Sequence, residues 1–267
     1  MTDRYAVIGR PVAHSKSPWI HAEFARQTRQ DLDYGRIEAP LDGFARTLDE
    51  FRSGGGRGAN ITIPFKAQAC LYCRDAVTPR ARAAGVVNTL IFEGGQVRGD
   101  NTDGVGLLRD LTMNLGRAVA GARVLLMGAG GAAQGVLEPL MQARPARLVI
   151  ANRSVDKARA LAQRYGASAG GGYGELQGQQ FDLLINATSA GLAGEAPALP
   201  AGVFSAGALG YDMVYGRDTP FLAQARAAGA AAHDGSGMLV EQAAESFQLW
   251  RGVRPDTAPV LAALRGR

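Results

Sequence analysis

The segment that most constrains the fold is an apolar strand that runs directly into a glycine-rich turn and a helix. Val124–Met127 is predicted as the strand, Gly128–Ala132 as the turn and Ala133–Ala143 as the helix. Residues 128–133 fit the pattern G-x-G-x-x-[GA], whose glycines let the backbone turn sharply and approach a pyrophosphate at a helix N-terminus. Because strand and helix flank the motif as this interpretation requires, the sequence predicts a Rossmann-type dinucleotide-binding unit.

Strands and helices alternate along the rest of the chain. Apolar strands are predicted over residues 5–9, 59–63, 86–92, 148–151, 183–186 and 209–211. Helices are predicted from about Pro18, after Pro64, from Asp100-Asn101-Thr102-Asp103-Gly104 to about Leu115, after Pro220 and over residues 238–250. This alternation predicts the α/β class, with two α/β halves that meet near residue 102 and parallel or mixed sheets covered by helices.

The composition is that of an ordinary globular protein, with 46% hydrophobic and 20% charged residues. A formal charge of +5 favours an acidic small ligand, since the arginines form no basic block or aromatic-interleaved stripe typical of nucleic-acid binding. No apolar run reaches the roughly eighteen residues of a membrane helix, and no secretory signal is recognised. We therefore expect a cytoplasmic location.

The two cysteines, Cys70 and Cys73, form a C-x-x-C that suggests redox or metal chemistry. They fall in a segment predicted to be helical, and the second ligand pair of a zinc site is missing. The histidines also lack metal-ligand spacing. We therefore expect two partly buried thiols and no metal.

The strand after the glycine-rich turn ends at Asn152-Arg153-Ser154, where enzymes that prefer NAD carry an acidic residue for the ribose 2′-hydroxyl. The first carboxylate here is Asp156, and Lys157 and Arg159 follow it. Cationic groups attract a 2′-phosphate, so we expect Arg153 to select NADP. For Arg159 we favour the alternative, a solvated charge on a helix face.

Lysine is scarce in this chain, with three residues against 26 arginines. Lys16, Lys66 and Lys157 each lie beside a motif. Since arginine keeps its proton in proteins whereas lysine can lose one, a retained lysine is a candidate for proton chemistry. Lys66 just past a strand end and Asp103 at a helix start are suited to converge on a reacting hydroxyl. Taken alone, they would more often be a surface lysine and a helix cap.

Motifs along almost the whole chain closely resemble the shikimate/quinate dehydrogenase family and appear in that family's order. They are His14–Pro18, Asn60–Lys66, Asn88-Thr89, Asp100–Gly104, Asn186–Ser189, Tyr211–Tyr215 and Gly237–Ala243. The resemblance implies a substrate-binding domain over residues 1–102, an NADP-binding Rossmann domain over 103–236, and C-terminal helices over 237–267 that return to the substrate domain. It implies reversible NADPH-dependent reduction of 3-dehydroshikimate to shikimate, in aromatic amino acid (chorismate) biosynthesis. A homodimer is left open.

The resemblance also implies roles for individual residues. Lys66 and Asp103 would be the catalytic pair. The substrate would be bound by Ser15 and Ser17 at its carboxylate, and by Thr62, Asn88 and Gln242 at its hydroxyls, with Tyr215 nearby. The cofactor would be bound by Gly128, Ala129, Gly130, Gly131, Ala132, Asn152, Arg153, Ser154, Lys157, Thr188, Met213 and Gly235.

Two residues depart from the family's common pattern. Lys157 stands where many relatives have arginine, which keeps the charge but loses the fork geometry for phosphate. Ser154 replaces a common threonine and keeps the hydroxyl. Lys16 and Ser17 match shikimate-specific members more closely than quinate-using ones. Two alternatives stay open: a quinate/shikimate dehydrogenase of broader specificity that also accepts NAD, and a non-catalytic sensor, which would not need Lys66 and Asp103.

Overall fold

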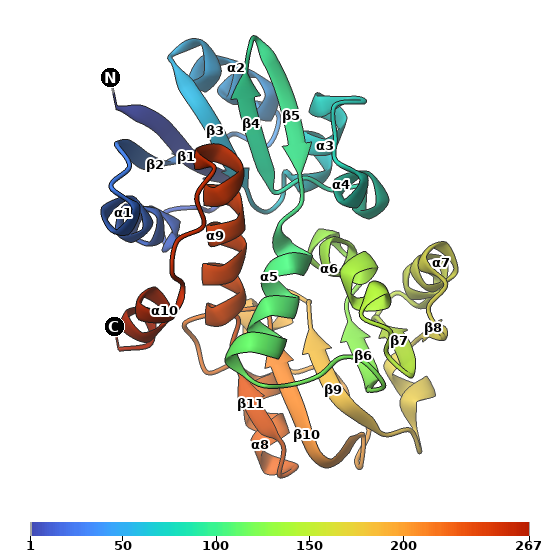
Figure 1. Cartoon of the computed structure of the whole chain (residues 1–267). Coiled ribbons are helices and arrows are strands. Elements are labelled where there is room, and N and C mark those ends of the chain that lie inside the picture. Colours follow the sequence, from blue (N-terminus) through green and yellow to red (C-terminus); the bar gives the residue numbers. More distant parts are fainter. Residues whose placement is uncertain (1, 267) are drawn as a thin grey trace. The chain divides into compact units, whose positions relative to one another are not determined.

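The computed structural model describes residues 2–266, with the backbone alone at residues 192 and 193 (Figure 1). It divides into two compact units, Met1–Gly106 with Leu239–Arg267, and Leu107–Met238. Each unit is an α/β fold built on one sheet. The predicted class is therefore confirmed, and the C-terminal helices do return to the N-terminal unit.

The first unit has a five-stranded mixed sheet of order β2-β1-β3-β4-β5. β1 pairs in parallel with β2 and β3, whereas β4 pairs antiparallel with β3 and β5. The elements of this unit are β1 (Asp3–Gly9), α1 (Ser17–Thr28), β2 (Leu32–Glu38), α2 (Phe44–Ser53), β3 (Gly56–Ile61), α3 (Lys66–Cys73), α4 (Pro79–Ala84), β4 (Thr89–Glu93), β5 (Gln96–Asp100), most of α9 (Ser236–Arg251) and α10 (Ala258–Arg265).

Alternating side chains of β1 supply both faces of this sheet, as the period of a strand requires. Ala6 and Ile8 pack in a core with residues of α2 and α3. Tyr5 and Val7 point to the other face, where the ring of Trp250 from α9 lies 4.7 Å from that of Tyr5. The C-terminal helices thus cover a face of the N-terminal sheet.

His21 is fully buried on this second face, inside a box of aromatic rings. Its ring stacks on Tyr34 with centroids 4.2 Å apart, and Phe24, Phe247 and Trp250 surround it. Neither ring nitrogen makes a hydrogen bond of normal geometry, although the Asn60 amide lies close. Burial lowers the pKa of His21 to about 3, so the ring is neutral in the folded protein.

The second unit has a six-stranded sheet of order β11-β10-β9-β6-β7-β8, in which every pairing is parallel. Its strands are β6 (Arg123–Met127), β7 (Arg147–Ala151), β8 (Ala169–Gly171), β9 (Phe181–Asn186), β10 (Phe204–Asp212) and β11 (Ala231–His233). Its helical segments are the C-terminal end of α5 (Asp103–Arg109), which begins in the first unit, a π turn at Asp110–Asn114, α6 (Gly131–Gln142), α7 (Val155–Tyr165) and α8 (Pro220–Ala227).

Helices cover both faces of this parallel sheet. One core joins alternate residues of the strands to α5, α6 and α7, and another joins the remaining strand residues to α8. Strands buried on both faces carry near-continuous apolar runs, such as Val124–Met127, which explains why they were readily predicted.

Some predicted elements need correction. The strand predicted over residues 86–92 begins only at Thr89, because Val86 and Val87 lie in the turn that follows α4. The helix predicted to run to Leu115 ends instead in the π turn. Strands β2, β5, β8 and β11 and helices α2 and α4 were not predicted.

Candidate active site

The first unit contains an ion pair between Lys66 and Asp103. Lys66 opens α3 shortly after β3, and Asp103 opens α5 shortly after β5. Lys66 Nζ lies 2.6 Å from Asp103 Oδ2, and the two side chains are only 16% and 7% exposed. The fold thus joins two residues 37 positions apart in a site where little water screens their charges.

Asn88 holds the other oxygen of the Asp103 carboxylate. Asn88 Nδ2 donates to Asp103 Oδ1 at 2.9 Å. The backbone N–H of Asp103 donates to Asn101 Oδ1 at 3.0 Å, so Asn101 supplies a side-chain cap at this end of α5. The Asp103 carboxylate is therefore fixed between Asn88 and Lys66, with both oxygens engaged.

Gln242 of α9 lies beside Asn88. Gln242 Oε1 is 3.4 Å from both Asn88 Nδ2 and Thr102 Oγ1. The approach depends on Gly106, because a Cβ at that position would lie 2.7 Å from Gln242 Cβ. The structure thus gathers four predicted site residues: Lys66 of α3, Asn88 of the loop before β4, Asp103 of α5 and Gln242 of α9.

Of the predicted carboxylate-binding serines, Ser15 lies in the loop after β1 and Ser17 is the first residue of α1. Ser15 and Ser17 are 7% and 6% exposed, and the Ser17 N–H donates to Ser15 Oγ at 3.3 Å. Arg36 of β2 donates two hydrogen bonds to the Ser15 carbonyl, at 2.6 and 3.1 Å. This contact ties the serine loop to the neighbouring strand.

Thr62 follows β3, the other parallel neighbour of β1. Its N–H donates to the Ile8 carbonyl at 2.9 Å. Gly9 is required here, because a Cβ on it would overlap the Thr62 side chain. Since the carboxyl ends of parallel strands meet at one edge of a sheet, the serine loop and Thr62 share an edge. Tyr215 belongs to the second unit, so its predicted place beside the substrate stays a prediction.

In the second unit, the glycine-rich turn has the backbone that a phosphate-binding loop needs. Gly128 has a φ of +113°, and a Cβ on it would lie 3.1 Å from the Ala187 carbonyl. Gly130 precedes the first residue of α6, and the space where its Cβ would be is open. The N-terminus of α6 is therefore accessible to an anion.

A pocket of about 230 Å³ joins this turn to the end of β7. It is lined by Ala129, Gly130, Asn152, Arg153, Ser154 and Lys157, all predicted cofactor residues. Two cationic side chains and an open helix N-terminus suit a phosphorylated dinucleotide. Arg159 does not line this pocket and pairs with Glu175 at 3.3 Å.

Thr188, Met213 and Gly235 lie in the loops that follow β9, β10 and β11. The Thr188 N–H and hydroxyl donate to Asn186 Oδ1 at 3.2 and 2.7 Å. Asn186 in turn donates to Asp212 Oδ2 at 3.1 Å, and burial raises the pKa of Asp212. A Cβ on Gly235 would overlap the Met213 carbonyl, so these two loops touch.

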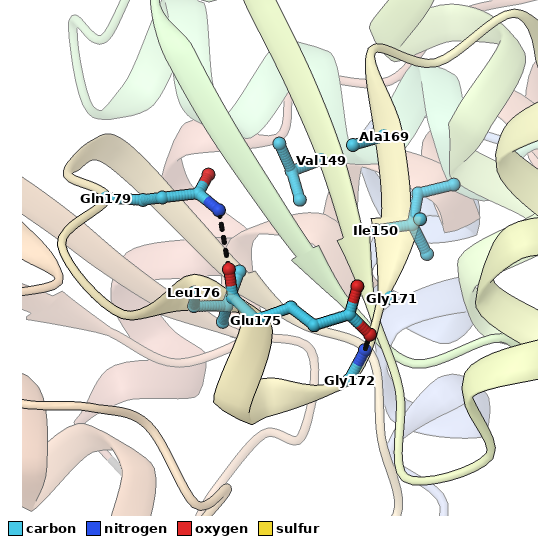
Figure 2. Close-up of a pocket in the computed structure, with 9 residues that line it drawn as sticks. Val149, Ile150, Ala169, Gly171, Gly172, Glu175, Leu176 and Gln179 are labelled. Carbon is cyan, nitrogen blue, oxygen red and sulfur yellow. Dashed lines mark hydrogen bonds between the residues drawn. The ribbon is translucent and has the colours of Figure 1, made fainter.

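Sequence reasoning gave no individual role to two groups of residues. Asn186 and Asp212 fix these loops. Behind Asn88 lie four further polar residues: Asn60, Thr89, Thr102 and Ser246. The signal available was their polarity within apolar strands and helices. A smaller pocket of about 80 Å³ beside β7 and β8 also went unpredicted (Figure 2). It is lined by Glu175, Gln179 and glycines 170–172 and includes no predicted site residue.

Comparisons with known proteins agree with this geometry. Family models for the shikimate dehydrogenase substrate binding domain, shikimate/quinate 5-dehydrogenase and the shikimate 5′-dehydrogenase C-terminal domain match residues 7–90, 110–193 and 235–265. The shikimate dehydrogenase (NADP(+)) of Methylobacillus flagellatus is 58% identical over 98% of this chain and 99% of its own. That of Aromatoleum aromaticum is 60% identical over 98% and 97%. The chain belongs to the shikimate dehydrogenase family.

A solved shikimate dehydrogenase shares the fold over nearly the whole chain. The Thermus thermophilus enzyme, crystallised with NADP(H) and shikimate, superposes with a TM-score of 0.90 and 35% identity, covering 99% of both chains.

Among residues 2–266, no group of three or more His, Cys, Asp or Glu side chains is placed to hold a metal. Within the same range, no helix is long and apolar enough to cross a membrane.

Proposed function

We propose that this chain reversibly reduces 3-dehydroshikimate to shikimate with NADPH, as a step of aromatic amino acid biosynthesis, and that Lys66 and Asp103 transfer the proton. The observation that carries the proposal is the partly buried ion pair of 2.6 Å between them, held in place by Asn88. The names of the curated relatives support the substrate and the cofactor.

Oxidation of a secondary alcohol removes a hydride from carbon and a proton from oxygen. The bound nicotinamide supplies the hydride in reduction and accepts it in oxidation. Lys66 donates a proton to the carbonyl oxygen in reduction and takes one from the hydroxyl in oxidation. Asp103 orients the ammonium group and also accepts a hydrogen bond from the reacting hydroxyl.

The substrate residues are those at the edge of the first sheet. Ser15 and Ser17 bind the carboxylate, while Thr62, Asn88 and Gln242 bind the ring hydroxyls. We also assign Tyr215, in the loop after β10, to substrate binding. The first unit, with its C-terminal helices, is thus the substrate-binding domain, and the second unit binds NADP.

In the cofactor unit, Gly128–Ala132 bind the pyrophosphate at the N-terminus of α6. Asn152, Arg153, Ser154 and Lys157 line the pocket that takes the adenosine 2′-phosphate. Thr188, Met213 and Gly235 contact the rest of the dinucleotide from the loops after β9, β10 and β11.

The decisive assay measures reduced cofactor formed by the purified protein with shikimate or quinate, each paired with NADP or NAD. Rapid turnover with shikimate and NADP alone is the expected result. Comparable turnover with quinate or NAD would assign the chain to the broader-specificity members. Absence of turnover in a folded protein that still binds NADPH would contradict the proposal. A cytoplasmic location and a homodimer stay predictions.

A further inference from the structure

Behind Asn88 lies a cluster of uncharged polar side chains that the proton-transfer scheme does not use. Tyr34, Asn60, Thr89 and Ser246 come from β2, β3, β4 and α9, and each is at most 7% exposed. Buried donors and acceptors need partners, so the chemistry of each group restricts how its neighbours are oriented.

A backbone donor identifies which atom of the Asn88 amide is the oxygen. The Thr102 N–H donates to Asn88 Oδ1 at 2.8 Å, and a backbone N–H cannot act as an acceptor. Thr89 Oγ1 lies 2.8 Å from the same oxygen, so the Thr89 hydroxyl must be the donor there. Asn88 Nδ2 is then directed at Asp103 Oδ1.

The Asn60 amide is fixed in the same way. Asn60 Nδ2 donates to the backbone carbonyl of Asn88 at 3.2 Å. The same nitrogen lies 3.2 Å from Thr89 Oγ1 and 3.0 Å from Ser246 Oγ. Asn60 Oδ1 accepts from the Tyr34 hydroxyl at 2.7 Å. Thr89 thus accepts from Asn60 and donates to Asn88.

These bonds all point one way, from Tyr34 through Asn60, Thr89 and Asn88 to the Asp103 carboxylate. Donors aligned in series polarise one another, and this series ends on a negative charge that gains from it. We propose that Thr89 is a positioning residue: its hydroxyl orients Asn88 so that Asp103 Oδ1 is held and Asp103 Oδ2 stays directed at Lys66. The proposal rests on the proposed roles of Lys66 and Asp103.

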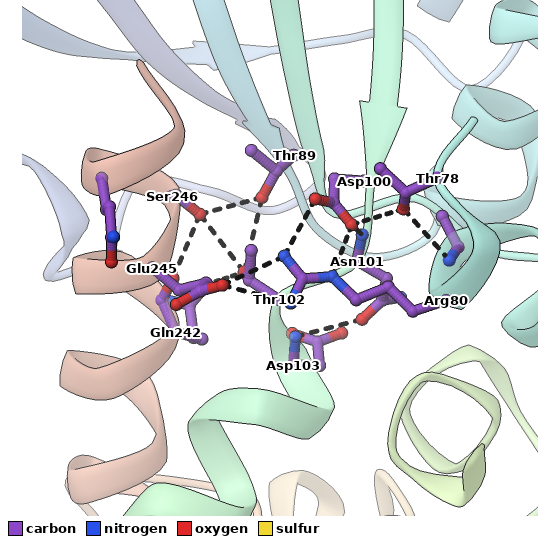
Figure 3. A network of polar contacts seen from close by, with 12 residues as sticks. Thr78, Arg80, Thr89, Asp100, Asn101, Thr102, Asp103, Gln242, Glu245 and Ser246 are labelled. Carbon is purple, nitrogen blue, oxygen red and sulfur yellow. Dashed lines mark hydrogen bonds and ion pairs between the residues drawn. The ribbon is translucent and has the colours of Figure 1, made fainter. Parts of the chain in front are cut away.

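Other charged groups of the first unit meet this network from α4, β5 and α9. Arg80 pairs with Asp100 at 2.7 Å and with Glu245 at 3.1 Å (Figure 3). Asp100 also accepts from the Asn101 N–H at 2.7 Å, beside the cap of α5. Changes at Thr89 leave these ion pairs intact.

The test is Thr89→Val, which keeps the shape of the side chain and removes its donor. The variant is expected to fold, since Asn88 Oδ1 keeps the Thr102 N–H and Asn60 Nδ2 keeps Ser246. We expect kcat to fall about tenfold, or about 1.4 kcal/mol, with the KM for shikimate raised less than about threefold.

Thr89→Ser keeps the hydroxyl and should restore both kcat and the KM for shikimate. Thr47→Val is the matched control, since that hydroxyl donates to the Gly43 carbonyl in the first turn of α2 at 3.0 Å, and it should behave as wild type. A wild-type kcat in Thr89→Val would overturn the proposal. So would equal losses in Thr89→Val and Thr89→Ser, which indicate packing.

Lys66→Ala measured in parallel separates the two proposals. If Lys66→Ala is inactive and Thr89→Val is normal, the positioning role alone is wrong. If Lys66→Ala keeps its turnover, the proton-transfer pair is wrong and the positioning role with it. Should Thr89→Val fail to fold, Tyr34→Phe removes the first donor of the series, and an unchanged kcat there would also overturn the proposal.

Discussion

Lys66 differs from the other two lysines in its surroundings. Lys16 and Lys157 are exposed, whereas the Lys66 ammonium lies in a partly buried pair with Asp103. An arginine at position 66 could form an ion pair with Asp103, but it could not release a proton. The proposed chemistry therefore explains why a chain that otherwise prefers arginine keeps lysine at this position.

Lys66→Ala and Lys66→Arg test that explanation together. Both should lower kcat by at least about a hundredfold, because each removes the proton-transfer group. Lys66→Arg should keep the ion pair with Asp103, so its thermal stability should stay close to wild type. NADPH affinity, measured by fluorescence titration, should be unchanged in both. Substantial turnover in Lys66→Arg would mean that position 66 needs only a positive charge.

Arg153 and Arg159 form a matched pair for cofactor selection. Arg153 lines the pocket at the end of β7, whereas Arg159 pairs with Glu175. Loss of a charge-assisted contact to phosphate costs about 1.5–3 kcal/mol, so Arg153→Ala should weaken NADPH binding about ten- to a hundredfold. NADH binding should change by less than about twofold. Arg159→Ala makes the same change in charge and should leave the affinities for NADPH and NADH near wild type. If the two variants changed NADPH affinity equally, Arg153 would not be a ligand of the 2′-phosphate.

At the scale of elements, the start of α9 depends on a close backbone approach within the second unit. A Cβ on Gly237 would overlap the Asp110 carboxylate, which is fully buried and accepts from the Tyr211 hydroxyl at 2.6 Å. The Met238 N–H donates to the same hydroxyl at 3.3 Å. The π turn that carries Asp110 and the first turn of α9 are therefore packed through a glycine.

Gly237→Ala should lower the free energy of unfolding by about 2–4 kcal/mol, because the added methyl must displace a buried, hydrogen-bonded carboxylate. Gly35→Ala in β2 is the control, since no atom lies within 4 Å of the added Cβ, and it should change stability by less than about 0.5 kcal/mol. Urea denaturation of both variants measures the difference. If Gly237→Ala and Gly35→Ala had equal free energies of unfolding, the π turn at Asp110 would be able to accommodate the added methyl group without loss of stability.

The elements that could be predicted from the sequence are those whose signal is local. The strand, glycine-rich turn and helix from β6 to α6 are contiguous and buried, and their residues alone indicate the structure. The missed strands β2, β5, β8 and β11 all lie at sheet edges, where pairing on one side suffices and polar residues are tolerated. In β2 only Tyr34 is buried, so no apolar alternation reveals it.

The candidate site shows the same limit. Lys66 and Asp103 could be proposed from their places after strand ends, and resemblance added Asn88 and Gln242. However, the contact of Asn88 with Gln242 joins residues 154 positions apart, and Asn60 with Ser246 joins residues 186 apart. Contacts of that range follow from how α9 packs on the first sheet, which no short segment encodes.

For the whole molecule, His21 makes stability depend on pH. Its pKa is lowered from 6.5 to about 3 on folding, so the unfolded chain binds the proton first as pH falls. The neutral His21 ring contributes to the free energy of unfolding. That contribution is fully present above pH 6.5 and is lost as the pH falls toward 3. Between pH 6.5 and 4.5 this loss amounts to about 2–3 kcal/mol, at about 1.4 kcal/mol per pH unit.

His21→Phe should remove that part of the pH dependence, because phenylalanine keeps an aromatic ring in the box and has no proton to bind. Chemical denaturation at pH 6.5 and 4.5 gives, for wild type and variant, the difference in the free energy of unfolding between the two pH values. The carboxylates common to both proteins cancel in the comparison. Parallel stability curves for the two proteins would show that His21 is not the buried neutral group described above.

The split of the first unit between the two ends of the chain determines when its core can be completed. Ile20 and Phe24 of α1 pack against Val240 and Phe247 of α9 and Val260 of α10. During synthesis these partners leave the ribosome more than two hundred residues after α1. The second unit is a single continuous segment and can fold while it emerges. The N-terminal part of the first unit, by contrast, keeps one face of its sheet uncovered until α9 and α10 have been made.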